Sequence, residues 1–113
     1  MKLNKNLRSL LNYYKTITPA LLIRIIKEYL ETNTPLLIIT KEFNYRIKVR
    51  YIDNYGDVFI GYDKSYIDYD KKTRQNVELG IISKTFNFSH KNLLRLSEEI
   101  LSSDITGISG YQP

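Results

Sequence analysis

Apolar residues between positions 19 and 32 recur at the spacing of an amphipathic α-helix. Thr18 can cap this helix, because its hydroxyl can accept a hydrogen bond from a free N–H of the first turn, and Pro19 suits the first helical position. The apolar side of the predicted helix is formed by Leu21, Leu22, Ile25, Ile26, Tyr29 and Leu30. A shorter apolar stripe at residues 7–14 predicts a first helix that packs against this one.

From Leu36 onward, apolar and polar residues alternate with a period of two, and β-branched and aromatic side chains predominate. This pattern indicates a short strand at 36–40, a longer strand at about 44–52 and a return strand at about 57–63. The sequence DNYGD between the last two predicts a hairpin turn, because Gly56 can adopt the left-handed conformation.

The two strands of this hairpin predict one apolar face and one charged face. The apolar face is expected to pair Tyr51 with Val58, Val49 with Ile60 and Ile47 with Tyr62. The opposite face is expected to pair Arg46 with Asp63, Lys48 with Gly61 and Arg50 with Phe59. A phenylalanine would then stand among three cations.

The rest of the chain predicts a second hairpin and a last helix. Residues 65–70 and 77–82 alternate on either side of the polar stretch KKTRQN, and several of their outward positions are acidic. Ser89 can cap a helix whose apolar stripe ends at Leu101. Residues 104–113 show no periodicity and predict a flexible tail.

These elements predict a single α+β domain over residues 1–103. It consists of two N-terminal helices, a twisted antiparallel meander of four to five strands, and a C-terminal helix. A chain of 113 residues can bury such a core without disulfides, and it contains no cysteine, which fits a reducing compartment. Its apolar runs are too short to cross a bilayer. We therefore expect a soluble cytoplasmic protein, located in the host cytoplasm if it is viral.

Charge is distributed unevenly along the chain. The net charge is +5; residues 1–50 hold ten basic and three acidic side chains, whereas residues 51–113 hold seven basic and nine acidic ones. A basic excess on one part of a protein favours nucleic acid, an anionic membrane or an acidic protein as the partner.

The charged face of the first hairpin is the strongest candidate site. Cations at Arg46, Lys48 and Arg50 would stand about 7 Å apart and could follow a phosphate backbone, and an exposed Phe59 could stack on an unpaired base. Lys5 and Arg8 could extend this surface. The main hypothesis is a non-enzymatic nucleic-acid-binding protein that prefers single strands and has weak sequence specificity. The alternative without a binding function is a solvated charged face, on which Arg46 pairs with Asp63 and a helix covers Phe59.

The tyrosine content supports a second hypothesis. The chain has ten tyrosines; Tyr55 is expected in the hairpin loop and Tyr66 at an outward-facing position. Such residues are favoured at interfaces with bases and with proteins alike. The alternative is thus a protein-interaction module, such as an inhibitor or adaptor encoded by a virus or another mobile element. The chain could also form a homodimer.

The sequence predicts no catalytic residue, cofactor or metal site. A metal-dependent nuclease is the third and weakest hypothesis. It rests on the acidic DxD pattern at Asp68 and Asp70, which could bring two carboxylates to one side of a strand. However, His90 is the only histidine, and acidic residues beside turns are usually solvated.

Overall fold

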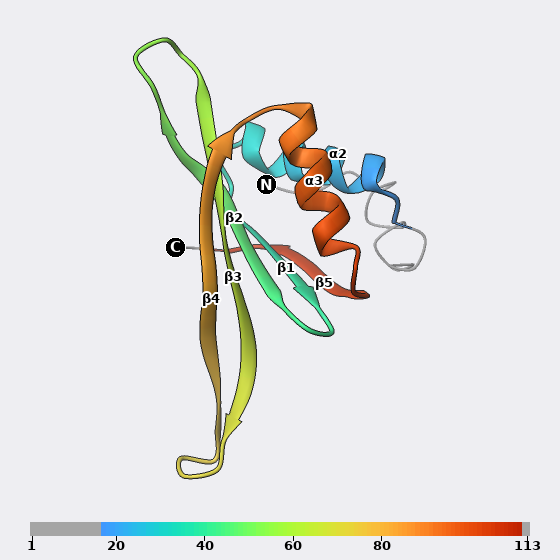
Figure 1. Cartoon of the computed structure of the whole chain (residues 1–113), viewed down its shortest axis with the longest axis vertical. Helices are drawn as coiled ribbons and strands as arrows, with labels where there is room; N and C mark the ends of the chain where they lie inside the picture. The colour runs from blue at the N-terminus through green and yellow to red at the C-terminus, as the bar shows by residue number, and fades with distance from the viewer. Residues whose placement is uncertain (1–16, 112–113) are drawn as a thin grey trace.

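A computed structural model describes residues 17–111 of the chain, and Figure 1 shows how its elements are arranged. In chain order, the elements are α2 (Pro19–Glu31), β1 (Leu36–Thr40), β2 (Asn44–Ile52), β3 (Val58–Asp70), β4 (Gln75–Asn87), α3 (His90–Ile100) and β5 (Ile105–Gly110). The helix predicted from residue 19 and the helix predicted after Ser89 are both confirmed.

Both helices begin where the sequence supplies a capping side chain. Thr18 Oγ1 accepts a hydrogen bond from the N–H of Leu21 at 3.2 Å, and Ser89 Oγ accepts one from the N–H of Asn92 at 3.3 Å. A cap of this kind typically stabilises a helix by about 0.5–2 kcal/mol. Local sequence therefore fixes where α2 and α3 start.

The five strands form one antiparallel sheet in the order β4-β3-β2-β1-β5. Strands β1 to β4 pair with their neighbours in sequence, and the chain then passes through α3 to the far edge, where β5 pairs with β1. Both helices lie on the same side of the sheet (Figure 1).

The core lies between the two helices and the sheet face that they cover. Its fully buried aliphatic side chains are Leu22, Ile25, Ile26, Leu36, Ile38, Ile47, Ile60, Leu93 and Ile100. The rings of Tyr45 and Tyr62 also belong to the core, and their centroids are 6.0 Å apart. Burial of each of these large side chains contributes about 1.5–3 kcal/mol, so this layer accounts for most of the favourable folding energy.

The architecture predicted from the sequence, with two N-terminal helices before a meander and a helix at the end, is wrong. In the described part of the chain, one helix precedes the sheet, four strands lie between α2 and α3, and a fifth strand follows α3. The predicted helix at residues 7–14 lies outside the described residues. The segment predicted as a flexible tail, 104–113, contains β5 because Ile105 is buried in the core and the backbone pairs with β1.

A β-bulge changes the predicted register of the first hairpin. The pairing of Val49 with Ile60 is confirmed, but the register shifts between Val49 and Tyr51. Tyr51 consequently lies opposite Phe59, at the place predicted for Arg50. The one extra residue therefore turns Tyr51 away from the core face predicted for it.

Strands β3 and β4 continue beyond the helices as a two-stranded ribbon (Figure 1). Each strand has 13 residues, and the pairing runs to Asp70 and Gln75 at the tip. The N–H of Arg74 donates to the carbonyl oxygen of Asp70 at 2.8 Å, which closes the turn. We call residues 65–80 the projecting ribbon.

Candidate binding surface

The sheet face opposite α2 and α3 is called here the open face. Side chains alternate between the two faces of a strand, and Tyr45 points into the core, so its neighbour Arg46 and then Lys48 lie on the open face. Arg50 and Phe59 also lie on this face, as their contacts below show. The structure therefore brings together the four residues that the sequence singled out on the first hairpin.

Arg50 is the extra residue of the bulge, and polar groups on two other strands hold its guanidinium group. Its Nη2 lies 3.0 Å from Oδ1 of Asp63 on β3 and 3.4 Å from Oγ of Ser83 on β4. Its side chain crosses Gly61, where a Cβ atom would collide with Arg50 and with the carbonyl oxygen of Lys84. Hydrogen bonds from Ser83 and Arg50 lower the pKa of Asp63. Arg50 is therefore a well-positioned cation.

Arg46 forms an ion pair with Glu78 of β4, although it lies opposite Asp63 in the register. Ser65, on the strand between them, donates a hydrogen bond to Glu78 Oε1 at 2.7 Å. Hydrogen bonds from Arg46 and Ser65 lower the pKa of Glu78. The Arg46 guanidinium group also lies over the ring of Tyr111, 5.8 Å from its centroid. The predicted register partner of Arg46, Asp63, is thus confirmed, but the ion pair of Arg46 is formed with Glu78 and spans three strands.

Lys48 stands between the two arginines along β2 and lies opposite Gly61. Within residues 17–111, Lys48 forms no ion pair, whereas Arg46 and Arg50 each have a carboxylate partner. Three cations and two carboxylates give this part of the open face a net charge of +1. Lys48 is therefore the one cation of this row that forms no close ion pair in the described part of the chain, although its charge contributes to lowering the pKa of Asp63.

The rings of Tyr51 and Phe59 are stacked on each other at the end of this row. Their centroids are 4.6 Å apart and their planes differ by 15°. Tyr51 is 52% exposed, and Phe59 is half-buried and does not belong to the core cluster. The sequence pattern missed Tyr51 because nothing in it signals the bulge that turns this ring outward.

The other residues proposed from the sequence do not join this surface in the described structure. Lys5 and Arg8 lie outside the described residues. His90 is the first residue of α3 and is exposed. Asp53 accepts hydrogen bonds from two backbone N–H groups of its own turn, and no group of three metal-binding side chains occurs in residues 17–111. Asp68 and Asp70 lie on the projecting ribbon.

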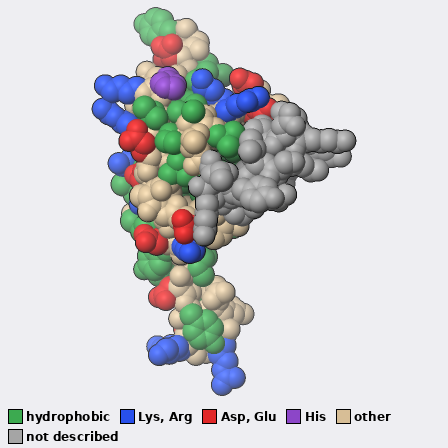
Figure 2. All heavy atoms as spheres, turned by 90° about the vertical axis from the view of Figure 1, so that its right-hand side faces the viewer, with side chains coloured by type: hydrophobic (Ala, Val, Ile, Leu, Met, Phe, Trp, Pro, Cys, Tyr) green, Lys and Arg blue, Asp and Glu red, His purple; other side chains and the backbone are tan. Residues whose placement is uncertain are grey.

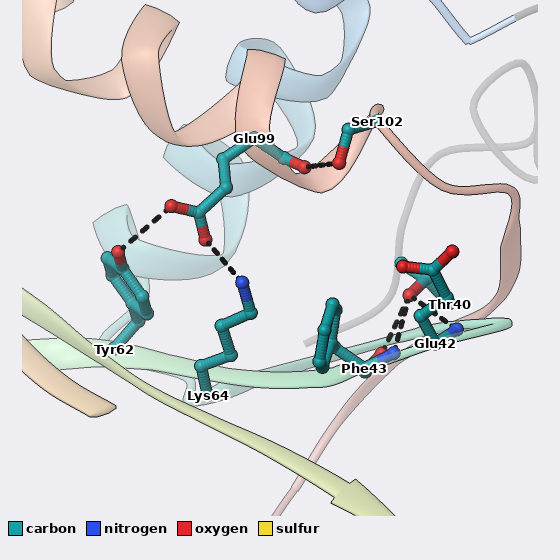
Figure 3. Close-up of polar contacts among 7 residues, drawn as sticks. All are labelled: Thr40, Glu42, Phe43, Tyr62, Lys64, Glu99 and Ser102. Atoms are coloured by element: carbon teal, nitrogen blue, oxygen red, sulfur yellow. Dashed lines mark hydrogen bonds and ion pairs between the residues drawn. The ribbon is translucent and has the colours of Figure 1, made fainter. Parts of the chain in front are cut away.

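A second polar cluster lies on the helix side of the sheet (Figure 3). Glu99 of α3 accepts a hydrogen bond from the Tyr62 hydroxyl at 3.5 Å, and its other oxygen lies 3.5 Å from Nζ of Lys64. Lys64 also lies over the ring of Phe43, 4.1 Å from its centroid. Burial and the nearby Glu99 carboxylate raise the pKa of Tyr62 to about 12. These contacts join α3 to the sheet.

A pocket of about 210 Å³ lies beside this cluster, between α3 and the β3–β4 ribbon. Tyr62, Phe86 and Leu96 line it together with the polar side chains of Lys84, Asn92, Arg95 and Glu99. Both basic side chains belong to exposed residues. The Glu99 carboxylate already contacts the Tyr62 hydroxyl and Lys64, so the open face remains the better candidate site.

The sequence matches no known family model, and a comparison with curated proteins finds no similar sequence. No helix in residues 17–111 is long and apolar enough to cross a membrane. The interpretation of function therefore depends on the surface chemistry described above.

Proposed function

We propose that the open face binds single-stranded nucleic acid, without catalysing a reaction on it. The observation that carries this proposal is the stacked pair of Tyr51 and Phe59 beside Lys48 and Arg50, on a sheet face that neither described helix covers. Phe59 lies outside the core cluster, so its ring can take part in stacking with a base.

The chemistry of the row suits an unpaired strand. The outer face of the exposed Tyr51 ring is available for a base, and stacking of one base on an aromatic ring contributes about 1–3 kcal/mol. Lys48 supplies a cation for a phosphate. A guanidinium group has five N–H donors, so Arg50 can keep its contact with Asp63 and still donate to a second acceptor.

The electrostatic part of this binding should be modest. At most three cations of the open face can contact phosphates, and two of them already interact with carboxylates. For single strands, each phosphate contact adds about −0.7 to the slope of log affinity against log salt concentration, so a slope of about −2 is expected. Basic residues outside the described range could make it steeper.

The ion pairs also favour a second candidate, recognition of a protein. A face with net charge near zero, two fixed arginines and a tyrosine–phenylalanine pair resembles the composition of protein interfaces, in which arginine and aromatic residues are enriched. A protein partner would supply groups of both signs, whereas phosphates must compete with Asp63 and Glu78.

Fluorescence anisotropy with labelled single-stranded and duplex DNA and RNA separates these candidates. Lys48→Ala should weaken binding to single strands by roughly three- to tenfold at about 50 mM salt. The matched control is Lys27→Ala, which removes the same charge from α2 on the other side of the molecule. Absence of binding by the unmodified protein, or an equal effect of the two substitutions, would reject the nucleic-acid proposal and leave the protein partner.

A further inference from the structure

Strand β4 forms one edge of the sheet along its whole length. Among residues 17–111, β3 is its only strand partner, paired from Gln75 to Asn87, and every residue of β4 except Phe86 is exposed. The outer side of an edge strand presents a row of unpaired N–H and C=O groups, which another β-strand can complete. The chemistry of this edge therefore specifies a strand as its partner.

The side chains of β4 are unusually apolar for such an edge. Val77, Leu79, Ile81 and Ile82 are between 37% and 50% exposed. The strand contains no proline and only one lysine, Lys84, although these are residues that commonly protect edges from pairing. The pairing of β4 with β3 has one irregularity, another β-bulge, at which Ile81 has no partner on β3. The pairing is regular on both sides of this bulge.

We propose that β4 pairs with β4 of a second copy of this chain, antiparallel and about a two-fold axis near Ile81. The two five-stranded sheets then form one continuous sheet. If the axis is perpendicular to the sheet, the helices of both copies lie on the same side of the continuous sheet. With the axis at Ile81, this side chain lies opposite its own copy, whereas Ile82 lies opposite Gly80, Leu79 opposite Ser83 and Val77 opposite Thr85 of the other copy.

Charge complementarity supports a second copy as the partner. The edge strand itself carries only Glu78 and Lys84, so its net charge is zero while the whole chain has +5. The ends of the two long hairpins differ in sign: the basic residues at one tip are Lys71, Lys72 and Arg74, and the acidic residues at the other are Asp53 and Asp57. The two tips lie at opposite ends of the long axis (Figure 1), and Figure 2 shows basic side chains at its lower end. Antiparallel pairing brings the basic tip of one copy toward the acidic end of the other.

Sedimentation equilibrium of the full chain tests this inference. The unmodified protein at about 100 μM should have twice the 13.3 kDa mass of one chain, and Ile81→Lys should have the mass of one chain. The matched control is Ile67→Lys, because Ile67 is equally exposed at 50% but lies on β3, away from the outer edge. A monomeric unmodified protein, or a dimeric Ile81→Lys variant that retains its fold, would overturn the proposal.

A cross-linking experiment keeps the proposal testable if Ile81→Lys fails to fold. The chain has no cysteine, so one introduced cysteine can form a disulfide only with the same residue of a second copy. Residues facing each other across antiparallel strands have Cα atoms about 4.5–5.5 Å apart, within the range that a disulfide can span. Under mild oxidation, Ile81→Cys should form a disulfide-linked dimer at least tenfold faster than Asn76→Cys near the strand end. Equal rates for the two variants would contradict pairing centred on Ile81.

Discussion

Arg46 on β2 and Glu78 on β4 form an ion pair across the intervening strand β3. The contact links the central part of the sheet to the projecting ribbon. The sequence pattern had assigned the basic residues to the first hairpin and the acidic residues to the second, and predicted no contact between them. Since Ser65 of β3 also donates to Glu78, three neighbouring strands share one polar contact on the open face.

Neutralising Glu78 should remove this stabilisation. Both side chains of the pair are about one-third exposed, so we expect Glu78→Gln to lower the free energy of unfolding at pH 7 by only about 0.5–1 kcal/mol. The pKa of Glu78 is lowered in the folded protein, so the stabilisation is present at neutral pH and disappears as pH falls through that folded-state pKa. Urea denaturation should therefore show the stabilities of the two proteins converging as pH falls below the ordinary titration range of a glutamate. Asp68→Asn, which neutralises an exposed carboxylate on the same ribbon, should have no such effect.

Tyr62 should make the fold sensitive to alkaline pH. Its pKa is raised to about 12 by burial and by Glu99, whereas an unfolded tyrosine titrates near 10. The raised pKa favours the neutral form, so its contribution is complete below about pH 10 and is lost as pH rises toward 12. Thermal unfolding followed between about pH 8 and pH 11 should show a smaller loss of stability for Tyr62→Phe. An identical pH dependence for both proteins would contradict this assignment.

Gly61 should tolerate no side chain. A Cβ at this position would overlap Arg50 and the backbone carbonyl oxygen of Lys84, and the backbone of a central strand cannot easily move. Gly61→Ala should therefore destabilise the protein by about 1–3 kcal/mol. Gly80→Ala is the matched control, because a Cβ there meets no atom within 4 Å. Chemical denaturation of the two variants should separate them clearly, and equal stabilities would show that Arg50 does not lie across Gly61.

Substitutions of two neighbouring residues on β3 should have different effects, one on nucleic-acid affinity and the other on stability. Phe59→Ala should lose about 1–3 kcal/mol of single-strand affinity, through the loss of a stacking platform, while the protein remains folded. Ile60→Ala, one residue further on, removes a fully buried side chain and should lower the free energy of unfolding by about 2–5 kcal/mol. Anisotropy and urea denaturation of both variants provide the comparison. Global unfolding of Phe59→Ala would place that ring in the core instead.

Local features of the fold could be predicted well. The caps at Thr18 and Ser89 and the helical spacing that follows them are encoded within a few residues, and both helices begin where expected. The alternation of β2 and β3 likewise fixed their pairing as far as Val49 and Ile60. These predictions succeeded because each depends on neighbours along one strand, hairpin or helix turn.

Features that depend on distant segments were not accessible from the pattern. The bulge at Arg50 has no signature of its own, so Tyr51 was assigned to the wrong face. Strand β5 has only six residues, of which Gly107 and Gly110 disfavour a strand, and its backbone forms one by pairing with β1. The partner of Arg46 was missed for the same reason, since Glu78 is 32 residues away.

The most direct test of binding at the open face is a ¹⁵N–¹H NMR titration of the protein with a short unlabelled single-stranded oligonucleotide. The proposal predicts chemical-shift changes concentrated at Lys48, Arg50, Tyr51 and Phe59, with little change along α2 and α3. Unchanged spectra at millimolar oligonucleotide, or changes confined to the helix side of the sheet, would contradict it.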